Sequence, residues 1–168
     1  VQHNTTIVTG YSANLMSLTT DGTYVFVSFF NGTNAYTLVL NAQLLTVLSP
    51  TIIASGVTIQ NITASAINGT ATVIFEIQNS YSYDGSISSN YVESRTIAAS
   101  GALGSTILLA RSVGLASQSF VVGGSIYVLT AYNSPYQPTY FLMNLSGQVI
   151  ARLAYSNGGG YVTAGLPH

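Results

Sequence analysis

The chain has 168 residues, of which 48% are apolar and only 4% are charged, with three arginines, no lysine and four acidic residues. Three cations are too few for a phosphate-binding surface or a basic membrane patch, which argues against nucleic acid as a partner. Disordered chains combine high charge with low apolar content, so this composition indicates a folded domain instead.

The first ten residues form a candidate strand. They run from Val1 to Gly10, with Ile7 and Val8 among them, and have no obvious hairpin partner beside them. The chain starts without an initiator methionine, which predicts the mature form of a secreted protein. It also has no cysteine, so neither a disulfide framework nor a thiolate metal site is expected.

The remainder, residues 11–168, predicts strands throughout. Short runs rich in β-branched and aromatic residues alternate with turn signals, without the sustained spacing of three and four that marks a helix. In chain order, the expected strands are Tyr24 to Phe30, Ala35 to Leu40, Leu44 to Leu48, Thr72 to Ile77, Tyr91 to Ala98, Thr106 to Ala110, Ser125 to Ala131, Thr139 to Leu145, Gln148 to Leu153 and Tyr161 to Ala164.

The expected strands are arranged in a weak internal repeat. The turns Asp21-Gly22, Asn68-Gly69 and Gly123-Gly124 each follow an apolar stretch and precede a strand, which predicts three meanders of about four strands. We expect an all-β, β-sandwich-like single domain of antiparallel meanders at residues 11–168, compatible with a threefold repeat. A propeller-like or β-prism-like arrangement is the alternative; closed propellers typically have 4–8 such units.

Two long charge-free stretches, residues 22–75 and 112–151, are interrupted every few residues by polar residues, glycine or proline. A spanning helix needs about 20 mainly apolar residues in succession. No membrane span is therefore expected in the mature chain.

The sequence offers few candidates for catalysis. Its two histidines, His3 and His168, lie at the chain ends, and no metal, cofactor or nucleophile motif is present. Glu76 and Glu93 lie on strands that flank one turn and could form the carboxylate pair of a glycoside hydrolase. The better interpretation of Glu76 is an ordinary cross-strand ion pair with Arg95. We expect no enzyme activity, no catalytic residues and no cofactor.

Acceptor patterns for N-linked glycans occur at five positions, Asn4, Asn31, Asn61, Asn68 and Asn144. Three of these, Asn31, Asn68 and Asn144, lie at expected hairpin turns, where a sugar can be accommodated. Because so few charges are available, glycans would supply the missing solubility.

Tyrosine is abundant, with 12 residues, and tryptophan is absent. Two clusters could stack on sugar rings, although tyrosine also half-buries well on strands. They comprise Tyr81, Tyr83 and Tyr91, and Tyr132, Tyr136 and Tyr140.

In its strand-like start from Val1 to Thr9, its charge-poor strands and its acceptors from Asn4 to Asn144, the chain resembles the subunits of archaeal extracellular threads and bundling pili. That resemblance implies a secreted, N-glycosylated β-sandwich that polymerises by donor-strand complementation, with residues 1–10 as the donor strand. The partners would then be further copies of the chain, and the location would be the cell surface.

The parity of residues 1–10 predicts how such a strand would insert. Successive side chains of a strand point to opposite faces, so a glycan on Asn4 would turn its own face outward. The other face would carry the anchors, Val1, His3, Thr5 and Ile7.

We therefore expect a structural subunit of an extracellular glycosylated filament or cell-surface layer. A carbohydrate-binding or adhesive module is the main alternative, and a fragment of a larger surface or viral appendage protein is another.

Overall fold

The computed structural model describes residues 15–78, 91–111, 114–132, 139–144 and 148–154, and all the regular elements in these ranges are β-strands. The first sheet, sheet A, contains β1 (Leu15–Thr20), β2 (Tyr24–Asn31), β3 (Asn34–Asn41) and β4 (Thr46–Ser55). Sheet B contains β5 (Thr58–Ile67), β6 (Thr70–Gln78), β7 (Tyr91–Ala98) and β8 (Ile107–Arg111). Sheet C contains β9 (Gly114–Val122), β10 (Ser125–Tyr132), β11 (Thr139–Asn144) and β12 (Val149–Ala154).

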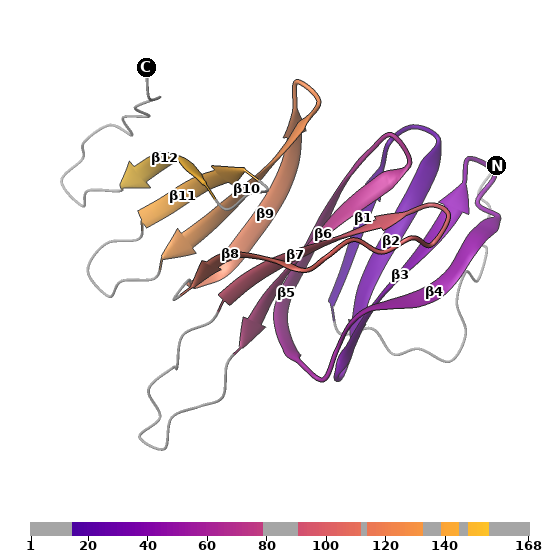
Figure 1. The fold of residues 1–168 in the computed structure, drawn as a ribbon, viewed down its shortest axis with the longest axis horizontal. Coiled ribbons are helices and arrows are strands. Elements are labelled where there is room, and N and C mark those ends of the chain that lie inside the picture. Colours follow the sequence, from indigo (N-terminus) through magenta and orange to yellow (C-terminus); the bar gives the residue numbers. More distant parts are fainter. Residues whose placement is uncertain (1–14, 79–90, 112–113, 133–138, 145–147, 155–168) are drawn as a thin grey trace.

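Each sheet is an antiparallel meander whose strands pair in chain order. The three sheets follow one another across the molecule, from the indigo and purple sheet A to the orange and yellow sheet C (Figure 1). The first strands lie against each other, β1 against β5 and β5 against β9. The all-β class, the antiparallel meanders and the threefold repeat are thus confirmed. The stack of three sheets corresponds to the propeller-like arrangement, which was the alternative to the β-sandwich-like one.

Local turn chemistry explains why the chain folds back at these places. Asn68 and Gly69 connect β5 to β6 with φ angles of 49° and 73°, and Gly123 and Gly124 connect β9 to β10 with 56° and 77°. Two successive positive φ angles define the hairpin turn whose twist matches that of the strands. Asn and Gly reach this region at low cost, so these dipeptides set the ends of the strands.

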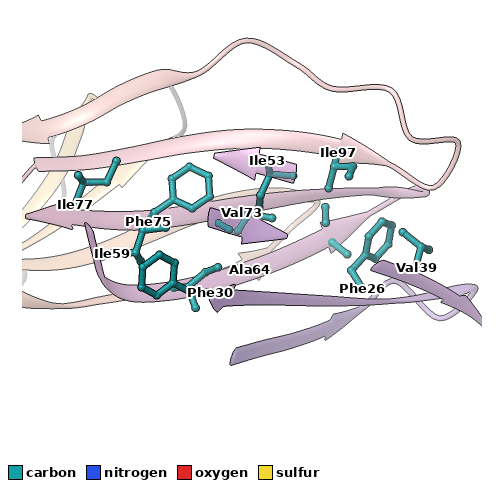
Figure 2. Packing of buried hydrophobic residues seen from close by; sticks show 14 residues of the cluster. Phe26, Phe30, Val39, Ile53, Ile59, Ala64, Val73, Phe75, Ile77 and Ile97 are labelled. Atoms are coloured by element: carbon teal, nitrogen blue, oxygen red, sulfur yellow. The ribbon is translucent and has the colours of Figure 1, made fainter. Parts of the chain in front are cut away.

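Sheets A and B enclose the main hydrophobic core. Phe26 and Phe30 of β2 belong to one cluster with Val73 and Phe75 of β6, and Ile53 of β4 and Ile97 of β7 are part of the same cluster (Figure 2). On the same face of sheet A, the buried hydroxyls of Ser28 and Thr37 share a hydrogen bond of 2.8 Å. This pair satisfies two polar groups that would otherwise destabilise a dry interface.

The contact between sheets B and C is more polar. Ser119 on β9 meets Thr63 and Ser65 on β5, with hydroxyl oxygens 3.1 and 2.9 Å apart. Ser17 on β1 occupies the corresponding place between sheets A and B, where its Oγ accepts a hydrogen bond of 3.0 Å from the Ala64 amide. Hydroxyl groups therefore recur at both contacts between first strands, that of β1 with β5 and that of β5 with β9.

None of the elements in the described ranges is a helix long and apolar enough to cross a membrane.

Candidate functional site

Glu76 and Glu93, the candidate carboxylate pair of the sequence analysis, lie on opposite faces of sheet B. Glu93 pairs with Phe75, and Glu76 pairs with Val92. Directly opposed residues share a face and adjacent residues do not, so Glu93 is on the face toward sheet A and the fully buried Glu76 is on the face toward sheet C. These two residues therefore do not form a carboxylate pair of the glycoside hydrolase type.

The expected ion pair between Glu76 and Arg95 is also wrong. Arg95 pairs with Val73, on the face toward sheet A, whereas Glu76 faces sheet C. The Arg95 guanidinium instead donates to two backbone carbonyls, through Nε to Gly104 at 2.9 Å and through Nη1 to Ile53 at 3.0 Å. Because Ile53 belongs to β4, Arg95 fastens sheet B to sheet A, a role that sequence reasoning missed.

Three of the five glycan acceptors lie at strand ends. Asn68 is exposed at the turn between β5 and β6, and Asn31 is half-buried at the end of β2. Asn144 ends β11, where its Oδ1 accepts from the Gln148 amide at 3.0 Å and its Nδ2 donates to Gln148 Oε1 at 3.2 Å.

Asn61 differs from these three because it lies inside β5. It is half-buried, and its side chain points to the face that carries Thr63 and Ser65, toward sheet C. Asn4 and the candidate donor strand, residues 1–10 with the anchors Val1, His3, Thr5 and Ile7, lie outside the described residues, as do Tyr81, Tyr83 and Tyr136.

Of the remaining tyrosines, Tyr91 packs half-buried against the core between sheets A and B. Tyr132 and Tyr140 lie at the paired ends of β10 and β11, next to one another along the register. Within the described ranges, no group of three or more His, Asp or Glu side chains is placed to hold a metal ion.

Asp21 joins the turns of two sheets. Its Oδ1 accepts the amides of Thr23 and Tyr24, each at 2.9 Å, and its Oδ2 accepts the amide of Gly69 from the β5–β6 turn. Partial burial is the largest single influence and acts to raise the pKa of Asp21. The backbone hydrogen bonds from Tyr24, Gly69 and Thr23 together outweigh it, and lower this pKa below its ordinary value of 3.8.

This network predicts a pH-dependent stability. Because the folded-state pKa of Asp21 is lowered, its contribution is fully present above the unfolded-state pKa and is lost as the pH falls through the folded-state pKa. Asp21→Asn is expected to lower the free energy of unfolding at pH 7, and to lower it by less as the pH falls below 3.8, towards pH 3. Urea unfolding of both proteins at the two pH values measures this, and an equal loss at both would contradict the assignment.

The outward face of β1 carries apolar side chains in contact with water. Leu15 and Ser17 point toward sheet B, so Met16 and Leu18 point the other way, and they are 66% and 64% exposed. They lie opposite Phe29 and Val27 of β2. A buried cluster occupies the middle of the same face, with Val25 and Tyr36 packed against it; it comprises Val27, Phe29, Leu38 and Leu40.

The outward face of sheet C has the same character along β9. Ser119 points toward sheet B, so Phe120 and Val122 point away from it, and they are 38% and 56% exposed. Phe120 stacks on Tyr127 of β10 with ring centroids 6.1 Å apart. Sequence reasoning missed these two faces, although Leu-Met-Ser-Leu at the start of β1, apolar on both faces, was a signal for the first.

Comparison with known proteins adds information on the fold. No family model matches the chain, and no curated protein matches it either. Among solved structures, the chain is similar to a mutant of the GH43 protein BlXynB from Bacillus licheniformis, with a TM-score of 0.58 and 15% identity. The match covers 88% of this chain but 32% of the other, so the chain spans about a third of that protein's length.

The matched protein is a five-bladed β-propeller. At this identity the likeness concerns the fold alone, and it agrees with the propeller-like stacking of sheets A, B and C.

Proposed function

We propose that this chain is a structural subunit of an extracellular, glycosylated assembly at a cell surface, in which copies of the chain bind one another. The observation that carries the proposal is the exposure of Met16, Leu18, Phe120 and Val122 on the two outward faces of the sheet stack. Exposed apolar patches favour association. β1 and β9 are also edge strands, which proteins that stay monomeric normally protect with charge or proline. Neither β1 nor β9 contains a charged residue or a proline.

The composition supports the same conclusion. Seven charged side chains in 168 residues leave little charge repulsion to keep copies apart. Insertion of residues 1–10 into a neighbouring copy, with Val1, His3, Thr5 and Ile7 as anchors, remains a prediction of the sequence.

Mass measurement by light scattering, together with electron microscopy of the purified chain, tests the proposal. We expect species larger than the 17.6 kDa monomer, in proportions that increase with protein concentration. A protein that stays monomeric at every concentration, both before and after deglycosylation, would refute the structural role.

Glycan occupancy is a separate prediction. Asn68 is exposed at a tight turn, so we expect it to carry a glycan in material from the native source, whereas the half-buried Asn61 faces a neighbouring sheet and leaves less room. Intact-mass measurement should show one glycan fewer for Asn68→Gln and no change for the matched variant Asn61→Gln. The opposite pattern would contradict the assignment.

A carbohydrate-binding or adhesive module is the second candidate, and the number of tyrosines in the chain, which could stack on sugar rings, favours it. In this case sugar binding would involve the tyrosines around the β10–β11 connection, Tyr132, Tyr136 and Tyr140. Glycan-array binding that is lost when these three residues are replaced by alanine would support it, and an array without signal would exclude it.

A further inference from the structure

The contact between successive sheets is repeated within the chain. The leading face of a sheet is defined here as the face toward the next sheet in the order A, B, C, and the trailing face is the opposite one. The leading face of β1 meets the trailing face of β5, and the leading face of β5 meets the trailing face of β9. Two first-strand faces have no such sheet against them in the described part of the chain: the trailing face of β1 and the leading face of β9.

We propose that these two faces bind each other between copies, so that β9 of one copy packs on β1 of the next. This deepens the proposed function, on which it rests, by naming the surface through which copies join. Phe120 and Val122 on β9 would then contact Met16 and Leu18 on β1. The new contact would extend the internal sequence of β1 on β5 and β5 on β9 by one step.

A second copy is the occupant that the repeat favours. Both faces belong to the same chain, and each is the counterpart of a surface that pairs inside it, so an identical chain supplies the missing side of both. Neither β1 nor β9 carries a charge, so no ionised group loses its hydration when the faces meet. Closed arrays of this kind typically contain 4–8 sheets, and the described part of the chain contains three.

The exposed side chains allow the contact to be tested without disturbing the core. Leu18→Asp places a carboxylate in the proposed contact. Leu45→Asp is its matched control, since Leu45 lies in the β3–β4 connection, away from β1, and is 63% exposed against 64% for Leu18. We expect Leu18→Asp to raise the dissociation constant of self-association about tenfold or more, and Leu45→Asp to leave it unchanged. Phe120→Asp, on the other side of the contact, should act as Leu18→Asp does.

Cross-linking gives a second measurement. The chain has no cysteine, so Leu18→Cys and Phe120→Cys can be prepared as separate proteins and mixed. Facing sheets lie about 10 Å apart, which calls for a short thiol-reactive cross-linker rather than a disulfide. We expect a covalent dimer from this mixture and none from Leu45→Cys mixed with Phe120→Cys.

The outcomes separate the two proposals. Self-association that persists unchanged in both Asp variants, with no selective cross-link, overturns the β9-on-β1 contact and leaves the structural role standing. A wild-type chain that never associates overturns both, and would assign the faces to further sheets of a longer polypeptide. Loss of association in both Asp variants, with circular dichroism unchanged, supports the contact, whether the wild type forms a discrete dimer or longer species.

Discussion

Replacing Phe75 with alanine is expected to lower the free energy of unfolding by about 3–5 kcal/mol, the usual cost of removing a buried aromatic ring. Phe75 is 1% exposed and lies in the core between sheets A and B, with Phe26, Phe30 and Ile53 in the same cluster. The space it would leave is lined from two sheets, so relaxation of one sheet alone cannot fill it. Urea unfolding followed by fluorescence or circular dichroism measures the loss.

A matched control is Leu45→Ala, which removes an exposed side chain from the β3–β4 connection and should change the stability by no more than about 0.5 kcal/mol. Phe75→Leu, which keeps most of the apolar volume, should fall between the two. If Phe75→Ala cost no more than Leu45→Ala, sheets A and B would not share the core described here.

Replacing Arg95 with alanine is expected to cost about 2–3 kcal/mol, because the guanidinium satisfies two backbone carbonyls at once. The Ile53 carbonyl lies in a residue that is 1% exposed, so the loss of Nη1 would leave this acceptor inside the protein without its donor. The midpoint of urea unfolding should fall while the slope stays unchanged, since the fold itself is retained.

Arg95→Lys tests the geometry of this contact. A lysine keeps the positive charge but lacks the planar arrangement of donors that reaches Gly104 and Ile53 together. We expect it to recover less than half of the stability lost in Arg95→Ala. Full recovery by lysine would mean that charge alone, and not the two directed hydrogen bonds, accounts for the effect.

Many of the strands could be predicted from the sequence because the signals for them are local. The runs Tyr24 to Phe30 and Tyr91 to Ala98 agree with β2 and β7, and the Asn68-Gly69 turn lies where it was predicted. Alternation of apolar residues and a dipeptide that accepts positive φ angles are properties of a few neighbouring residues, so they survive whatever the rest of the chain does. The threefold repeat followed from the same turns.

The faces of the strands could not be predicted in this way. The sequence allowed Glu76 to approach Glu93 and favoured an ion pair between Glu76 and Arg95, yet the register of β6 on β7 puts Glu76 on the opposite face of sheet B from both. A shift of one residue in the pairing reverses every side chain, and the intervening segment, residues 79–90, is too long for turn chemistry to fix the register. The register of the two strands, which the sequence does not specify, is therefore what separates Glu76 from Glu93.

The sequence by itself determined the all-β class, the positions of the main turns and the threefold meander, because each depends on contacts between near neighbours. Only the tertiary structure decided that the sheets stack as in a propeller, that Arg95 joins sheets A and B, and that β1 and β9 expose apolar faces. A shift in pairing between Ile59 and Asn61 of β5 shows the physical reason: it lets Ile59 and Ile62, three positions apart, point into the same core. Such irregularities are stabilised by packing between sheets, and no local pattern in one strand specifies them.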